Sequence, residues 1–223
     1  MRKLLFLKSL SLILLVPLGI ADPVVDVDCD VVCDFEQTIE KESKLVGEIW
    51  RMNRQDRFER IKAISIITGG QISPEDQQRV GNELFAIINQ NDRTRADRLK
   101  EILKSYSWAE MAEVEEDLPN RAWLIAQHAD HDPNFQLSVL NDITPLVKEG
   151  KMDGQTFTLM SDEISMEQNG YQIYGTQYEC ENGKYSINNI TDRSTVDDRR
   201  KEYGLQPLKD YLANLPELVG PCT

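Results

Sequence analysis

Apolar residues recur at three- and four-residue steps along several stretches of the chain, and this period is typical of amphipathic α-helices. The first stretch runs from Glu36 to Thr68, where "TGGQ" ends it; its apolar positions are Ile39, Val46, Ile49, Trp50, Ile61 and Ile64. The second, residues 73–106, opens with Ser73 as a helix N-cap and Pro74 at the first helical position. The segments "RQDRFERIKAI" and "QNDRTRADRLKEI", one in each stretch, look alike. We interpret them as two similar helices, because two short matches do not make a repeat array.

Three more helices are predicted in the middle of the chain. Residues 118–130 have no polar residue between positions 122 and 126, which predicts a helix that is buried on most sides. Asp132 precedes a proline and is therefore disfavoured in a helix, so this helix is expected to end near that residue. The stretches 134–150 and 153–170 supply two further helices, each closed by a glycine.

The last third of the chain contains one strand pair. Residues 171–190 alternate in polarity around an Asn-Gly dipeptide at positions 182–183, which is typical of a tight hairpin turn. Thr195 and Asp198 predict a capping box for the next helix, and a last short helix follows Pro207. The predicted fold class is therefore mainly α: a single-domain helical bundle with one small β-hairpin near the C-terminal third.

The start of the chain has the pattern of a signal peptide. Arg2, Lys3 and Lys8 precede a short apolar run, and Ala21 supplies the small residue that a signal peptidase needs. We expect cleavage after Ala21 and export to the periplasm or the extracellular space. Residues 22–35 are interpreted as an acidic tether and residues 36–223 as one domain. No other apolar run approaches the length of a membrane span, so the mature protein is expected to be soluble.

The net charge narrows the choice of partners. The full chain carries a formal charge of −13, and removal of the three basic residues of the signal peptide changes this to −13 − 3 = −16. Such a surface repels phosphate backbones and anionic headgroups. We therefore expect no nucleic-acid partner and no membrane partner after cleavage, while the identity of any protein partner stays open.

The four cysteines are expected to form disulfides. An exported chain with an even number of cysteines is typical of disulfide pairing, and four cysteines allow three pairings. Proximity in the sequence favours Cys29 with Cys33 and Cys180 with Cys222. The second bond would tie the C-terminal tail to the rest of the fold, and a loop of that length is worth about 4 kcal/mol in the chain-entropy account. A four-cysteine zinc site is disfavoured because no C-x-x-C pair is present.

The residues that remain as candidates for chemistry lie in "RAWLIAQHADHDPNF", residues 121–135. The chain has no G-x-S-x-G, H-E-x-x-H or Walker motif, and this segment holds both of its histidines. On a helix, His128 lies one turn after Leu124, and Gln127 lies one turn after Trp123. Both polar side chains therefore emerge from a buried face. A buried imidazole or amide without a partner costs about 1–3 kcal/mol, so we expect partners for both.

Three segments together resemble a known family. "AWLIAQHADHDPNFQ", "YGTQ" at 174–177 and "DDRRKEYGLQPL" are similar to the motifs W-L-I-x-Q-H-A-D-x-D-P-x-F-Q, Y-G-T-Q and D-x-R-R of a bacterial domain family of unknown function. The resemblance spans residues 49–211 and implies no activity. The family pattern includes Gln127, His128, Asp130, Asp132, Gln136, Tyr174, Gln177, Arg199 and Arg200. It omits His131, and where the family has an acid-Arg pair this chain has Asp162 and Glu163.

Two interpretations of this polar cluster are favoured. The cluster is either an internal hydrogen-bond network that ties the hairpin to the helices, or a binding site for a small polar or anionic ligand. In the second case Arg199 or Arg200 would hold the anion, because the guanidinium group matches the geometry of a carboxylate or phosphate. Gln127 and Gln177 would recognise the ligand through hydrogen bonds. The candidate binding residues are Gln127, Tyr174, Gln177, Arg199 and Arg200.

The third interpretation is a hydrolase-type enzyme. His128 would act as a general base oriented by a carboxylate such as Asp130 or Asp56, with arginine stabilising negative charge. A metal-assisted variant would pair His128 with His131 and with Asp130 or Asp132. We disfavour it, because a proline after Asp132 breaks the helix that would align the two histidines. The catalytic candidates are thus His128 and Asp130, with no metal site, and the cofactor and the enzyme status stay open.

Overall fold

The computed structural model describes residues 29–70 and 72–222 of the chain. The predicted signal peptide, residues 1–21, and the first part of the predicted tether, residues 22–28, lie outside the described residues. The chain divides into two compact units, residues 1–40 and 41–223. The described part of the first unit belongs to helix α1 (Cys29–Thr68), which begins seven residues before the predicted start at Glu36. Everything that follows concerns the second unit.

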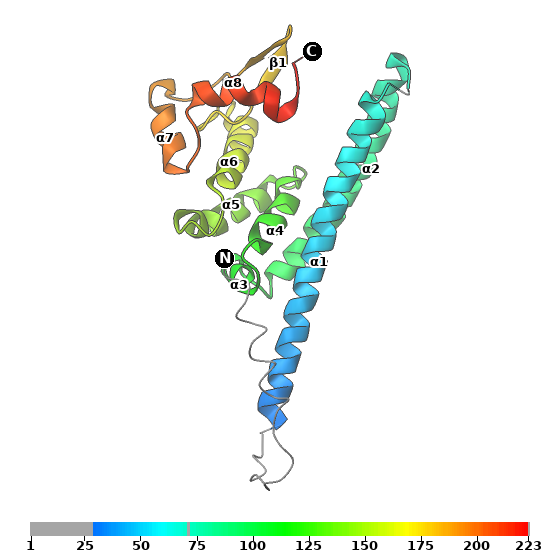
Figure 1. Cartoon of the computed structure of the whole chain (residues 1–223), viewed down its shortest axis with the longest axis vertical. Helices are drawn as coiled ribbons and strands as arrows, with labels where there is room; N and C mark the ends of the chain where they lie inside the picture. Colours follow the sequence, from blue (N-terminus) through cyan, green and yellow to red (C-terminus); the bar gives the residue numbers. More distant parts are fainter. Residues whose placement is uncertain (1–28, 71, 223) are drawn as a thin grey trace, which may run out of the picture. The chain divides into compact units, whose positions relative to one another are not determined.

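The fold is mainly helical with one small antiparallel hairpin, as predicted (Figure 1). Among the described residues, no helix is both long and apolar enough to cross a membrane. After α1 the elements are α2 (Pro74–Leu103), α3 (Trp108–Val114), α4 (Leu118–Gln127), α5 (Pro133–Lys148), α6 (Gly154–Asn169), β1 (Glu179–Glu181), β2 (Lys184–Ser186), the 3-10 turn η2 (Arg193–Thr195), α7 (Val196–Glu202) and α8 (Leu208–Val219).

Capping residues set where α2 and α3 begin. The hydroxyl of Ser73 accepts a hydrogen bond from the backbone N–H of Asp76, as expected for the N-cap that precedes a first-turn proline. Helix α3 was not among the predicted elements. A capping box starts it, in which the Ser107 hydroxyl and the Glu110 carboxylate each accept a bond from the other residue's backbone N–H. The signal for α3 is therefore present in the sequence as a Ser-x-x-Glu spacing.

Helix α4 ends earlier than predicted, at Gln127. His128 is its C-cap, and the backbone N–H of His128 still bonds to the carbonyl of Leu124 at 3.3 Å. Asp132 does not end this helix but begins the next one: its carboxylate accepts from the N–H of Phe135 as the N-cap of α5. The residues between His128 and Asp132 thus form a tight connection that presents the imidazole at the end of α4.

The hairpin and the C-terminal tail follow the sequence expectations. Strands β1 and β2 pair around Asn182 and Gly183, which both have positive φ, as a two-residue hairpin turn requires. A disulfide joins Cys180 in β1 to Cys222. The side chains of Cys29 and Cys33 lie outside the described part of the chain, so their pairing stays a prediction.

The predicted capping box at Thr195 is wrong. The Thr195 side chain makes no capping bond to α7, because it instead donates to the Asp192 carboxylate at 2.7 Å. Its oxygen also accepts a bond from Arg199 at 2.6 Å. The η2 turn before α7 causes this, since it brings the hydroxyl back toward Asp192.

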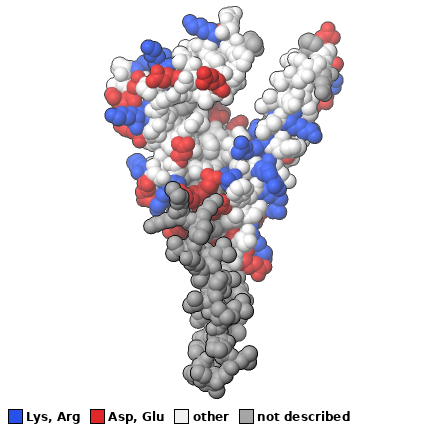
Figure 2. Space-filling model, viewed as in Figure 1, with Lys and Arg blue, Asp and Glu red and all other residues white. Residues whose placement is uncertain are grey.

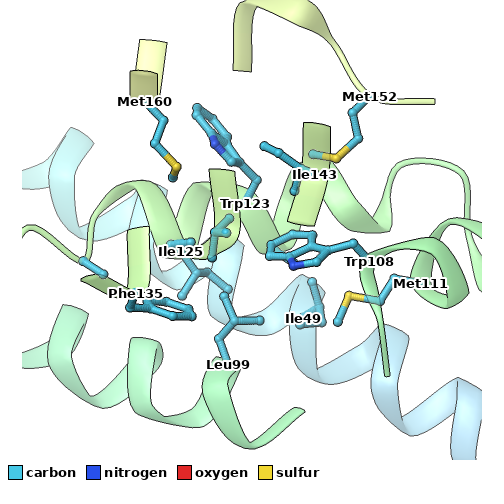
Figure 3. Close-up of a cluster of buried hydrophobic side chains, with 14 of the residues drawn as sticks. Ile49, Leu99, Trp108, Met111, Trp123, Ile125, Phe135, Ile143, Met152 and Met160 are labelled. Carbon is cyan, nitrogen blue, oxygen red and sulfur yellow. The ribbon is translucent and has the colours of Figure 1, made fainter. Parts of the chain in front are cut away.

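Large apolar side chains from α1 to α6 form the main core (Figure 3). Ile49 of α1 and Leu99 of α2 are fully buried beside Trp108 and Met111 of α3 and Ile125 of α4. A smaller cluster under the hairpin comprises Ile187, Val196, Leu208 and Leu215. On the surface, acidic and basic side chains are interspersed over the face shown in Figure 2.

A substitution at Leu99 tests whether packing in this core stabilises the fold. Leu99 is fully buried, so Leu99→Ala is expected to lower the free energy of unfolding by about 2–5 kcal/mol in urea melts. The control is Leu137→Ala on α5, whose side chain is 40% exposed; we expect a loss of about 0.5 kcal/mol or less. Equal losses for the two variants would contradict this placement of the core.

Candidate functional site

His128 contacts a buried carboxylate from a distant part of the chain. Its ring nitrogen Nδ1 lies 3.0 Å from Asp56 of α1. Asp56 is almost fully buried, whereas about a quarter of the His128 side chain is exposed. The pair therefore joins α1 to the end of α4 and leaves one part of the imidazole accessible.

Two arginines and a second carboxylate complete the surroundings of Asp56. Arg60 Nη2 lies 2.7 Å from Asp92 Oδ2, and Arg95 Nη2 lies 2.7 Å from Asp92 Oδ1. The same two guanidinium groups approach Asp56 Oδ1 at 3.3 and 3.4 Å. Arg95 also pairs with Glu59 at 3.0 Å. We call Asp56, Arg60, Asp92 and Arg95 the ion cluster.

The helical period of α1 and α2 explains how the ion cluster forms. Asp56 and Arg60 are four residues apart on α1, and Asp92 and Arg95 are three residues apart on α2. Each pair thus projects from one face of its helix. These residues belong to the two similar segments noted in the sequence, and in the structure the two segments face each other.

The environment shifts the pKa of each carboxyl in a different direction. Burial acts to raise the pKa of Asp56, but the hydrogen bond and charge of His128, helped by Arg60 and Arg95, hold it below the ordinary value. Burial raises the pKa of Asp92 and outweighs the effects of Arg95 and Arg60, with the nearby Asp56 adding to the rise. The surroundings of Asp56 thus favour its negative charge beside the imidazole.

The Nδ1 atom of His128 has two competing neighbours. Arg60 Nε lies 3.2 Å away and is a donor, whereas Asp56 Oδ1 lies 3.0 Å away and is an acceptor. Only one of these contacts is a hydrogen bond in a given neutral tautomer. Arg60 has other acceptors in Asp56 and Asp92, so we assign the Nδ1 proton to a bond with Asp56. The second ring nitrogen, Nε2, makes no hydrogen bond within the described part of the chain.

A small polar cavity of about 230 Å³ opens beside the imidazole. It is lined by Asn89, Asp92, Arg93, His128, Asp130 and His131. Asp130, the predicted carboxylate partner, lies on this cavity and accepts a bond from Gln136 Nε2 at 3.3 Å. The carboxylate that contacts the imidazole is Asp56, which was the other candidate partner. The accessible edge of His128 thus meets a space that is large enough for a small polar molecule.

The same residues offer a possible donor set for a metal ion. One ligand atom each from Asp56, Asp92 and His128 lie within 4.8 Å of one another. However, both carboxylates already pair with Arg60 and Arg95, and a divalent cation would have to compete with these two fixed positive charges. This donor set therefore fits a metal poorly. His131 is not part of it, and Asp132, the other residue of the metal variant, binds Lys100 at 2.8 Å.

Tyr174, Gln177, Arg199 and Arg200 do not join His128. They lie instead on or against the segment that holds Asp162 of α6, whose carboxylate accepts bonds from the backbone N–H groups of Ile173, Tyr174 and Thr176 at 2.6–2.9 Å. Arg199 Nε donates to the carbonyl of Ile173, and Arg200 Nη1 donates to that of Tyr174. The backbone N–H of Gln177 donates to Gln172 Oε1 at 2.8 Å. The structure thus separates these four residues from His128.

Gln127 faces a third group of residues. Its amide nitrogen donates to the carboxylate of Glu163. A second cavity, of about 550 Å³, opens there, and Glu163 and Asp130 are among its lining residues. Burial, together with the charges of Asp130 and Glu167, raises the pKa of Glu163 to about 7. Asp130 lines both this cavity and the cavity beside His128.

Comparison with known proteins identifies the family but no activity. Residues 58–221 match the model of a family of unknown function, DUF6624, and the chain therefore belongs to this family. No curated protein and no solved structure matches the chain. The family resemblance inferred from the sequence motifs is thus confirmed. Asp56 lies two residues before the matched segment, whereas Arg60, Asp92 and His128 lie within it.

Glu163 gives the stability a pH dependence of predictable sign. Its pKa is about 7 in the folded chain, against an ordinary value of 4.5. The folded state therefore holds a proton that the unfolded state releases in this window, so the free energy of unfolding falls as the pH rises through it. Glu163→Gln should flatten this slope in urea melts at about pH 5 and about pH 7.5. The exposed substitution Glu217→Gln is the control, and a slope that is unchanged in Glu163→Gln would contradict the assignment.

Proposed function

We propose that this protein is a hydrolase-type enzyme in which His128 acts as a general base. The observation that supports this most strongly is the contact between His128 Nδ1 and the buried carboxylate of Asp56, beside a polar cavity and with no partner for Nε2 among the described residues. A base needs a free nitrogen that reaches the substrate and a second group that fixes its tautomer and orientation. Asp56 fixes the tautomer and orientation of the imidazole, and the position of His128 on the cavity lets its free nitrogen reach a substrate.

Water is the proposed nucleophile. In the described part of the chain, no serine, threonine or cysteine is hydrogen-bonded to His128. With the Nδ1 proton bonded to Asp56, the Nε2 lone pair accepts a proton from a water molecule as that water attacks the substrate. The negative charge of Asp56 stabilises the imidazolium that forms, and Arg93 on the cavity wall is available to an anionic transition state.

The imidazolium formed in this step returns the proton. It carries the proton taken from water on Nε2 and gives it to the leaving group, while Nδ1 keeps its own proton in the bond with Asp56. His128 is then neutral again, with the lone pair of Nε2 restored. The proposed substrate is small and polar, in keeping with a cavity of about 230 Å³ that polar side chains line.

A second candidate function is purely structural. The ion cluster joins α1 to α2, and His128 adds the end of α4, so the histidine also qualifies as a brace between three helices. Buried polar networks of this kind stabilise one arrangement of helices without doing chemistry. A brace and a catalytic base respond differently to substitution, which allows the two to be separated.

We also propose that the mature protein works outside the cytoplasm. The disulfide between Cys180 and Cys222 supports this, since such bonds persist in oxidising compartments. The basic and apolar start of the chain, followed by Ala21, supports removal of a signal peptide.

The catalytic proposal predicts that activity requires both His128 and Asp56. A panel of chromogenic carboxylic esters, amides and phosphate monoesters would be incubated with the wild-type protein, His128→Gln and Asp56→Asn. We expect hydrolysis of at least one class by the wild type, and a loss of about 10²-fold or more in each variant. Asp142→Asn, at an exposed position on α5, is the matched control and should keep full activity.

Stability measurements on the same proteins separate the two candidate functions. For a catalytic base, His128→Gln is expected to be nearly neutral in urea melts, because active sites often hold polarity that stability alone does not favour. A brace predicts a loss of about 1–3 kcal/mol in His128→Gln. Such a loss, together with no hydrolysis by the wild type of any class in the panel, would contradict the catalytic proposal and favour the brace.

The proposed compartment is tested on protein recovered from an expressing culture. N-terminal sequencing is expected to begin at Asp22, and thiol labelling of the denatured, unreduced protein is expected to find no free cysteine. A retained Met1 would contradict export through a cleaved signal. Two labelled thiols per chain would contradict the pairing of Cys29 with Cys33.

A further inference from the structure

A cavity near the C-terminal end of the chain is lined by a buried cation that has no ionic partner among the residues the structure describes. The cavity has a volume of about 280 Å³, and Arg200 of α7 is one of its lining residues. Arg200 is only 1% exposed, and no carboxylate of the described residues lies within ion-pairing distance of its guanidinium group. Buried charges in proteins are ordinarily paired, because an isolated ion loses its hydration without compensation. Arg200 is therefore unusual within this fold.

The hydrogen bonds of Arg200 leave one of its nitrogens unused. Nε donates to the carbonyl of Gln206 at 2.7 Å, and Nη1 donates to the carbonyls of Tyr174 and Gly175 at 2.8 and 3.2 Å. Nη2 makes no hydrogen bond with any described residue. The three carbonyls hold the guanidinium group rigidly, and Nη2 is the part of it that remains for the cavity.

The nearest acidic groups do not neutralise Arg200. Asp197 and Asp162 act on it only at longer range, and burial lowers the pKa of Arg200 from its ordinary value despite them. Both carboxylates are engaged elsewhere: Asp162 binds the backbone around Thr176, and Asp197 binds the N–H of Leu208. The ring of Tyr211 lies 5.0 Å from the guanidinium carbon and contributes a cation–π contact, which offsets only part of the missing charge.

The rest of the lining indicates what kind of molecule would fit. Leu159, Leu205 and Leu218 form an apolar wall, and Leu218 is 62% exposed, so the cavity opens to solvent there. Gln155 adds an exposed amide at the same cavity. Asp153 is the one carboxylate of the lining, and its Oδ1 accepts the backbone N–H of Gln155 as the N-cap of α6. A second negative charge in the ligand would meet Asp153, which favours a singly charged anion.

We infer that this cavity binds a small organic monoanion, whose carboxylate or phosphate oxygen accepts a hydrogen bond from Arg200 Nη2 and whose apolar part lies against the leucine wall. The bound anion supplies the negative charge that the fold itself does not place beside Arg200. This site shares no residue with the cavity at His128 and does not depend on the proposed hydrolase activity.

Titration calorimetry on the full mature chain tests the site. The probes are acetate, butyrate and benzoate in one arm, and the phosphodiesters dimethyl phosphate and diethyl phosphate, which are monoanions, in the other, all at low ionic strength. At least one probe is expected to bind with one-to-one stoichiometry at concentrations up to about 20 mM. It should also raise the melting temperature by about 3 °C or more at ten times its Kd. The arm that binds identifies the oxyanion.

A pair of matched variants shows whether the binding occurs at this cavity. Gln155→Glu places a negative charge on the lining without changing the shape of the side chain, and it should weaken binding by about tenfold or more. Gln168→Glu makes the same change at an exposed position of the same helix, outside the cavity, and should bind like the wild type. Arg200→Met should abolish binding, but loss of the three carbonyl contacts can also unfold this variant, so the Gln155 pair is decisive.

Two results would overturn the inference. One is that no probe of either arm binds the wild-type chain. The other is binding that Gln155→Glu and Gln168→Glu weaken to the same extent, because this would indicate a general effect of net charge. His128→Gln serves as a further comparison and should bind the anion as the wild type does.

Discussion

The ion cluster between α1 and α2 is the interaction on which the candidate site depends. Asp56, Asp92 and Arg95 are all buried, and each carboxylate contacts both arginines. Removal of one member of such a cluster leaves a buried charge without compensation, at a cost of about 3–5 kcal/mol. The cluster therefore fixes the register of α1 against α2. Because His128 contacts Asp56, it also fixes where the end of α4 meets these two helices.

The local features of the fold follow from the sequence more closely than its tertiary contacts do. The apolar period predicts the long helices, Ser73 predicts the start of α2, and the Asn-Gly dipeptide predicts the hairpin turn. Each of these signals acts over a few residues. The predicted end of α4 lies too far along the chain. An aspartate before a proline is compatible both with the end of one helix and with the N-cap of the next, and Asp132 is the N-cap of α5. The capping box at Thr195 failed because the preceding turn offers its hydroxyl a closer acceptor.

The contacts of the candidate site are also tertiary, and they were harder to predict from the sequence than the helices were. The sequence indicates that Gln127 and His128 need polar partners, since both follow a buried stretch of helix. It offers Asp56 only as one of two candidate carboxylate partners and does not indicate Arg60, because these residues precede His128 by 72 and 68 residues and meet it only through helix packing. The expected single cluster is divided because Asp162 binds the backbone of the Y-G-T-Q segment. Arg60, Asp92 and Arg95 were not predicted as neighbours of His128, because they come together only when α1 packs against α2. The similarity of their two segments is nevertheless present in the sequence.

The central claim is that Asp56 holds the Nδ1 proton of His128 and thereby leaves Nε2 as a base. The tautomer of this histidine is directly observable by nuclear magnetic resonance, through long-range correlation of the imidazole nitrogens with the ring protons, in protein labelled with nitrogen-15. We predict that the neutral imidazole of His128 carries its proton on Nδ1 in the wild type, and on Nε2 in Asp56→Asn, where Arg60 becomes the remaining partner of Nδ1. A wild-type His128 that carries its proton on Nε2, with no change in Asp56→Asn, would contradict the claim.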